Sequence, residues 1–477
     1  MKAPFSKDLE NIRPRLKELV TRLRKHYAYV SILASDTKGF SIHISQHAKA
    51  VSNETMTTEK GIVIRVMKDG LYSEYASNEI DLSDLDACEK HICDVLDQQL
   101  TMLKQTNTEV YQTDVLDDEP CELFVEMDCE QLPEEVKIQD LVDSFVKLSN
   151  EAMQKSEELI DFRINAQSSH VCKMFLSEHR DLRQSYVYSE GGVHAFMARN
   201  GQNEMGSANV AGRKGPEVFA QFALLVDDAI KVANDLLNGE RVVPGEYEVI
   251  TAPEVTGLIA HEAFGHGVEM DMFVKNRALG KEYIGKRVGS DKVTMHEGAL
   301  SAIDVASYAF DDEGTLASDV IEIDHGILKT GICDALSAKR LNVKPTGNGK
   351  RENFAHKAYT RMTNTVFEGG NNTLEEMIAS IEYGYLLEGM RNGMEDPKHW
   401  GIQCVVDRGY EIKDGKLTGK IVCPLVVTGY VPDLLGNITM ATSEVLTFGC
   451  GGCGKGHKEW VKVSDGGPYL KTKVRLG

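Results

Sequence analysis

Two histidines enclose a glutamate in the stretch HEAFGH at residues 261–266. Neutral imidazoles are common zinc ligands, and a carboxylate beside them can take a proton from a metal-bound water. These residue types in this order predict a hydrolytic zinc centre, with His261 and His266 as ligands and Glu262 as the general base. The competing interpretation is two unrelated histidines on one helix, which the motif alone leaves about equally open.

The spacing of the two histidines sets a condition on the backbone. The common form of this motif places its histidines four residues apart, on one face of a helix. His261 and His266 are five apart, which on a regular helix turns them about 140° away from each other. Gly265 and Gly267 flank the second histidine, and glycine tolerates a distorted turn. We therefore expect the helix to deform, or to widen into a π-bulge, at Gly265.

A catalytic zinc site usually takes three protein ligands, so another donor must come from elsewhere in the chain. The glycine-rich stretch FGCGGCGKGHK offers the thiols of Cys450 and Cys453 and the imidazole of His457. The two cysteines could also form a redox pair, or half of a four-cysteine structural zinc site. No thioredoxin-like βαβ pattern surrounds them, however, and no second CxxC occurs. The residues therefore favour a thiolate ligand to a catalytic zinc.

Several polar residues are further candidates for the site. Glu269 and Asp271 follow the motif closely, and they fit two interpretations equally: carboxylates that orient a histidine ligand, or acids on a helix surface. Arg361 and Asn364 in the stretch RMTNT could bind substrate or stabilise an oxyanion. A structural tether is the favoured interpretation for Asn364, and a solvated side chain is the favoured one for Lys455.

The pattern of helices and strands expected along the chain, which must position these residues, predicts an α+β fold with three domains. Residues 1–105 combine N-terminal helices with a small antiparallel sheet, because short β-type runs lie between two helical patterns. Residues 106–240 predict a central α/β region with long helices, and residues 241–477 a mostly β C-terminal domain that carries the metal-binding helix. Apolar spacing predicts individual helices over residues 7–26, 83–104, 137–161, 216–238 and 374–385.

Composition narrows the class of protein. The net charge of −20 over 477 residues argues against a nucleic-acid partner, which would require a clustered basic face. No run of about 18 apolar residues occurs, so no membrane span is expected. The N-terminal stretch lacks the apolar core of a signal peptide, and the ten cysteines are scattered. Both features favour a cytoplasmic protein with reduced thiols.

Three segments together resemble a known family. EVTGLIAHEAFGHGVEMD, RMTNT at residues 361–365 and CGK at residues 453–455 are similar to the TldD/PmbA family of metallopeptidases, and within it to the catalytic TldD subunit. The resemblance implies that His261, His266 and Cys453 bind Zn²⁺ and that Glu262 activates water. Cys450 adds a second thiol to the family's pattern, but the CGK match favours Cys453.

The resemblance also implies a substrate and a partner. Members of the family hydrolyse unfolded or short peptides, which bind in an extended form. They act as dimers, either with a TldE/PmbA-like subunit that lacks the metal motif or as homodimers. Two alternatives remain: a non-catalytic binding subunit of a peptidase complex, and a zinc hydrolase of non-peptide amides.

Overall fold

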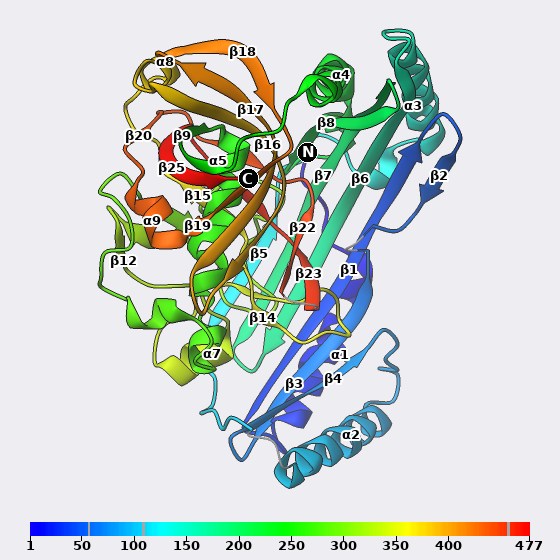
Figure 1. The fold of residues 1–477 in the computed structure, drawn as a ribbon. Helices are drawn as coiled ribbons and strands as arrows, with labels where there is room; N and C mark the ends of the chain where they lie inside the picture. Colours follow the sequence, from blue (N-terminus) through cyan, green and yellow to red (C-terminus); the bar gives the residue numbers. More distant parts are fainter. Residues whose placement is uncertain (56–57, 107–109, 456–457) are drawn as a thin grey trace.

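A large sheet from the first half of the chain, antiparallel except for the parallel pair β5 and β7, runs along the length of the molecule (Figure 1). The computed structural model describes residues 1–55, 58–106, 110–455 and 458–477, with no side chains described at 458 and 459. The sheet has eight strands in the order β4-β3-β1-β6-β7-β5, with β2 paired to β1 and β8 to β7. Their bounds are β1 Tyr29–Ile44, β2 Lys49–Ser52, β3 Lys60–Lys68, β4 Leu71–Ser77, β5 Cys121–Glu126, β6 Leu159–Ser177, β7 Arg180–Arg199 and β8 Gln202–Gly212.

Four helices cover this sheet, namely α1 (Lys7–Leu23), α2 (Leu85–Gln105), α3 (Ile138–Met153) and α4 (Phe222–Asn238). Helix α1 shows why they form, because its buried residues recur at helical spacing and pack with α2 on one end of the sheet. α3 and α4 pack on the other end around Phe145 and Phe222. The 3-10 helices η1 (Pro133–Glu135) and η2 (Pro216–Gln221) precede α3 and α4.

The second half of the chain contains two further large sheets. One has seven strands in the order β16-β9-β25-β19-β17-β18, with β20 on β25, and β16 also pairs with β17, so that five strands close into a ring. The other has six strands in the order β12-β11-β10-β15-β24-β21. The largest cluster of buried apolar residues, which includes Val249, Phe264 and Trp400, lies in this half.

The strands of the ring sheet are β9 Gly245–Thr251, β16 Tyr383–Asp396, β17 Gly401–Lys413, β18 Lys416–Val422, β19 Leu425–Tyr430, β20 Met440–Ala441 and β25 Leu470–Leu476. Those of the six-stranded sheet are β10 Met295–Glu297, β11 Val320–Asp324, β12 Ile327–Leu328, β15 Asn364–Phe367, β21 Leu446–Phe448 and β24 Ser464–Gly467. Two small pairs are β13 Gly349–Lys350 with β14 Tyr359–Thr360, and β22 Gly452–Lys455 with β23 Lys458–Lys462. The helices are α5 Pro253–Ala260, η3 His261–Gly265, η4 His266–Val268, α6 Asp271–Val274, η5 Leu279–Glu282, α7 Ala335–Leu341, α8 Leu374–Ala379 and α9 Val431–Gly436.

The α+β class predicted from the sequence is confirmed, while two predicted helices are too long. The helix expected over residues 137–161 ends at Met153, because the chain enters strand β6 at Leu159. The helix expected over residues 374–385 ends at Ala379, and β16 begins at Tyr383. The three-domain division stays a prediction; residues on both sides of position 105 contribute strands to the first sheet.

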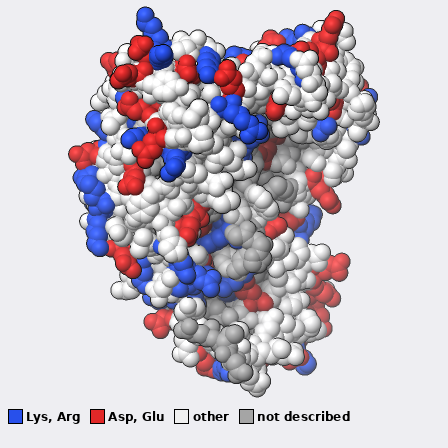
Figure 2. Space-filling model, in the orientation of Figure 1, with Lys and Arg blue, Asp and Glu red and all other residues white. Residues whose placement is uncertain are grey.

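The visible surface carries charges of both signs. On the face drawn in Figure 2, acidic and basic side chains are interspersed and do not gather into one large basic field. Among the described residues, no helix is both long enough and apolar enough to cross a membrane.

Candidate metal centre

The HEAFGH stretch lies where a helix breaks. Helix α5 ends at Ala260, and the next residues pass through a kink at which Phe264 has a φ of 79°. The predicted distortion is therefore present, but it falls at Ala263 and Phe264, whereas Gly265 has an ordinary right-handed φ of −56°. Core packing stabilises this strained backbone conformation. The side chain of Phe264 is fully buried and packs against Trp400, with ring centroids 5.0 Å apart.

The glycine at position 265 provides space rather than conformational freedom. A Cβ there would lie 2.4 Å from Sδ of Met362, well inside van der Waals contact. Met362 belongs to the RMTNT segment, so the missing side chain lets that segment approach the kink. The sequence-based expectation that Gly265 supplies conformational freedom for the turn was therefore wrong, since its φ is one that any residue can adopt.

The kink and the distant β22–β23 hairpin bring three metal donors together. Nε2 of His261 lies 3.1 Å from Sγ of Cys453, and Nε2 of His266 lies 3.3 Å from the same sulfur. The three ligand atoms all lie within 4.8 Å of one another. Two imidazoles and one thiolate fit zinc, whose tetrahedral bonds of about 2.0–2.3 Å would separate nitrogen from sulfur by about 3.5 Å. The observed separations differ from that value by only a few tenths of an ångström.

The charges of these three groups support one another. Burial favours the neutral thiol, but the two histidines outweigh it and hold the pKa of Cys453 well below its usual range. Burial lowers the pKa of His261, yet the neighbouring thiolate reverses the shift and raises that pKa to about 9. The pKa of His266 is raised for the same reason, with Glu269 as a second anion. The cysteine therefore offers a thiolate, the form that ligates metal ions.

Three carboxylates lie around the cluster. Burial raises the pKa of Glu262, although His261 opposes the shift, and burial raises the pKa of Asp465 to about 7 and of Glu395 to about 8. Oε2 of Glu262 and Oδ1 of Asp465 have no hydrogen-bond partner among the described residues. All three line an open cavity of about 740 Å³ that also exposes both histidines and Cys453. The cavity walls include Met272, Met390, Met394 and Trp460.

Glu269 and Asp271 are buried, not surface acids, with 1% and 5% exposure. Nδ1 of His266 lies 3.1 Å from Oε2 of Glu269. Nζ of Lys455 lies 3.1 Å from the same oxygen and 2.6 Å from Oδ1 of Asp271. The favoured interpretation of Lys455 as a solvated lysine was wrong, because ion pairs compensate its burial. Arg361 is fully buried as well and donates to the carbonyl oxygen of Cys453 at 2.8 Å.

Two other candidates stand apart from the cluster. Asn364 donates to the carbonyl of Gly298 at 3.1 Å and accepts from the hydroxyl of Ser464, which is a structural tether. Sγ of Cys450 lies against the first sheet, 3.4 Å from the carbonyl of Val210. Cys453 is therefore the cysteine that meets the histidines, and His457 lies outside the described residues.

Sequence reasoning missed the roles of Glu395, Asp465 and Lys455. Glu395 and Asp465 come from strands β16 and β24, far from the motif in the chain. Asp465 could not be recognised from the sequence, because only the folded chain brings it next to helix α5. There its Oδ1 lies so close to Gly257 that a Cβ at that position would be 2.5 Å away. For Lys455, the signal was its place in the CGK segment, two residues after the ligand cysteine.

The second half of the chain is similar in sequence to known metalloproteases. Residues 244–474 match the PmbA/TldA metallopeptidase C-terminal domain. The chain is 31% identical to a metalloprotease of Methanocaldococcus jannaschii, in an alignment that covers 59% of this chain and 61% of that protein. It is 28% identical to the metalloprotease TldD homolog of Buchnera aphidicola, with 61% and 62% covered. The zinc metalloprotease TldD homolog of Saccharolobus solfataricus is 31% identical, with 54% and 57% covered. The matched part thus spans about six tenths of these relatives' own lengths.

Solved structures extend the likeness of the fold over the whole chain. TldE from Thermococcus kodakarensis superposes with a TM-score of 0.75 at 16% identity, covering 97% of this chain and all of that one. A crystal structure from Bacteroides thetaiotaomicron gives a TM-score of 0.76 at 15% identity, covering 98% of each chain. The matched domain assigns the second half of the chain to a metallopeptidase class. More specifically, residues 244–474 are similar to the C-terminal domain of the TldD/PmbA family.

Proposed function

We propose that this chain is a zinc-dependent metallopeptidase that hydrolyses unfolded or short peptides. The observation that supports it is the convergence of His261, His266 and Cys453 beside Glu262, at the wall of an open cavity. Bound by those three side chains, zinc would polarise the scissile carbonyl and acidify a water molecule. Glu262 would accept the proton of that water and return it to the leaving amine nitrogen. Burial raises its pKa above the ordinary carboxylate value, which makes it a stronger base.

The test is the substitution Glu262→Gln, which keeps the shape of the side chain but removes the base. Peptide hydrolysis should be abolished while the zinc content stays at that of the unmodified chain. Glu254→Gln is a matched control, because Glu254 lies on α5, also has a pKa raised by burial, and accepts from the amide of Gly389, a bond that glutamine can keep. Full hydrolysis by the Glu262→Gln variant would overturn the mechanism.

A peptide substrate is supported by the form of the cavity as well as by the family. Its methionine and tryptophan walls offer apolar contact to side chains of many shapes, as expected for weak sequence preference. Turnover of denatured protein and short peptides, compared with that of small non-peptide amides, separates this proposal from an amide hydrolase. A chain with neither bound metal nor turnover would instead be a non-catalytic binding subunit.

We also propose that the chain works as a dimer, with a TldE/PmbA-like subunit or with a second copy of itself, in the cytoplasm. Similarity to the TldD/PmbA family supports the dimer, and the ten free cysteines agree with a reducing compartment. Light scattering of the purified chain, alone and mixed with a TldE/PmbA-like protein, measures the assembly. A mass of one chain in both samples would contradict it.

A further inference from the structure

The hairpin that carries Cys453 is not part of either large sheet of the second half. Within the described part of the chain, β22 and β23 pair only with each other. An isolated two-stranded hairpin is marginally stable by itself. Side-chain contacts from outside must therefore hold Cys453 within reach of the two histidines.

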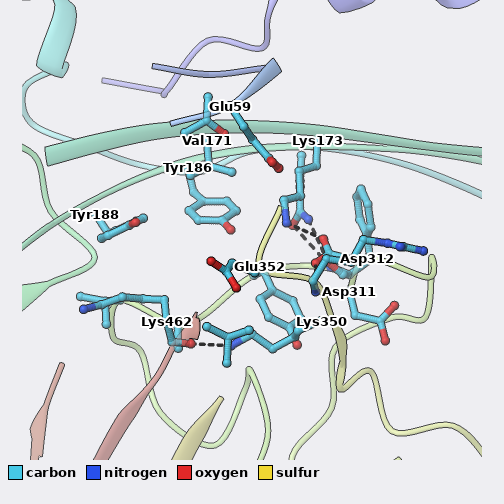
Figure 3. Close-up of a pocket in the computed structure, with 18 of the residues that line it drawn as sticks. Glu59, Val171, Lys173, Tyr186, Tyr188, Asp311, Asp312, Lys350, Glu352 and Lys462 are labelled. Atoms are coloured by element: carbon cyan, nitrogen blue, oxygen red, sulfur yellow. Dashed lines mark hydrogen bonds and ion pairs between the residues drawn. The ribbon is translucent and has the colours of Figure 1, made fainter. Parts of the chain in front are cut away.

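Basic side chains supply several of those contacts. Arg361 donates to the carbonyl of Cys453, as described above, and Lys350 donates to the carbonyls of Met362 and Lys462, the second of which ends β23. Figure 3 shows Lys350 reaching this carbonyl at the floor of a small cavity behind the hairpin. Lys462 in turn donates to Glu190 on β7 of the first sheet. These contacts hold strand β22 at Cys453 and strand β23 at Lys462.

Lys455 makes a different kind of contact, because it reaches the other half of the metal cluster. Oε2 of Glu269 lies 3.1 Å from Nδ1 of His266 and 3.1 Å from Nζ of Lys455. One carboxylate oxygen therefore joins the segment that carries the histidine ligand to the strand that carries the cysteine ligand. Since Nδ1 of His266 is engaged in this way, Nε2 is the nitrogen that faces Cys453.

The partners of Lys455 argue against a role in binding substrate. An ammonium group has three hydrogens to donate. Nζ of Lys455 donates to Oδ1 of Asp271 at 2.6 Å and to the carbonyl of Thr360 at 3.2 Å, and it forms an ion pair with Glu269 at 3.1 Å. These partners surround the ammonium group, and the lysine side chain is only 15% exposed, so it is poorly placed to meet the carboxylate of a bound peptide.

We propose that Lys455 is a positioning residue, which acts through Glu269 to hold the Cys453 thiolate and the His266 imidazole at one metal ion. The inference rests on the proposed function only in taking these residues as the metal site. Partners that orient metal ligands typically contribute a factor of about 10–100 in metal affinity. Lys455 differs from such partners in that it orients two ligands at once, from two segments that are remote in sequence.

The experiment measures zinc affinity of the full chain by competition with a chromophoric chelator. Lys455→Met should weaken zinc binding about 10–100-fold and reduce the thiolate-to-metal charge-transfer band of the cobalt-substituted protein. Lys275→Met is the matched control, because Lys275 pairs with the other oxygen of Asp271 at 3.2 Å. That control should bind zinc as the unmodified chain does. Lys455→Gln takes the place of the methionine variant if the latter fails to fold.

A double-mutant cycle with Glu269→Gln tests whether Lys455 acts through Glu269. In the Glu269→Gln background, replacing Lys455 should change zinc affinity by less than about threefold. Unchanged affinity of the Lys455 variants, or the same loss in both backgrounds, would overturn the proposal. If the unmodified chain binds zinc but hydrolyses nothing, the proposed function fails while this inference stands; if it binds no zinc, both fail.

Discussion

A methyl group added at Gly393 should displace Glu262 without touching the metal donors. Gly393 lies on β16, and a Cβ there would fall 2.5 Å from Cγ and 3.1 Å from Cδ of Glu262. Ordinary contact begins near 3.4 Å, so the glutamate must retreat by roughly 1 Å, a displacement that can cost about 100-fold in rate when it affects a reacting group. We therefore expect Gly393→Ala to lower kcat/KM about 10–100-fold.

The assay combines peptide hydrolysis with metal analysis of the same preparation. Zinc content should be unchanged, because the three atoms nearest to the new methyl group all belong to Glu262, which is not a metal donor. Gly429→Ala serves as the control, since this strand glycine has nothing within 4 Å of its added Cβ. Normal kcat/KM in a folded, zinc-loaded Gly393→Ala variant would show that Glu262 does not have to occupy its observed position for catalysis.

Other perturbations test the remaining parts of the structure. Cys453→Ser should lose bound zinc and Cys450→Ser should keep it, as metal analysis would show; the reverse pattern would reassign the ligand. Phe264→Ala should destabilise the chain by about 3 kcal/mol in urea unfolding, because it leaves a cavity in the core while alanine, which keeps its Cβ, gains no relief from the positive φ. For Glu74, burial raises the pKa, but Arg65 and a second arginine outweigh it and leave the folded-state pKa below its ordinary value. Its stabilising effect is thus present above about pH 4.5 and lost as the pH falls through the folded-state pKa. Glu74→Gln should accordingly be less stable than the unmodified chain at pH 7, with a difference that shrinks in acid; a difference independent of pH would contradict the ion pair.

The sequence predicted the chemistry of the site better than its geometry. Residue types and the CGK match pointed to the donors that the structure brings together. The place of the kink could not be predicted, because a phenylalanine at positive φ is tolerated only where surrounding packing enforces it. The partners of Lys455 were equally inaccessible, since nothing local in a CGK segment indicates that Glu269 and Asp271 will meet it. Helix 137–161 was overextended because apolar spacing continues into the start of a buried strand.

The separation of the metal donors along the chain has a consequence for how the protein is made. Cys453 follows His261 by 192 residues, and β9, which leads into the metal-binding helix, pairs along its length with β25 at residues 470–476. During translation, a ribosome exposes the histidines long before it exposes the cysteine or the strand that supports them. Contacts so distant in sequence form late in folding. The growing chain therefore cannot assemble this centre, and any activity that depends on it can begin only after synthesis has passed residue 476.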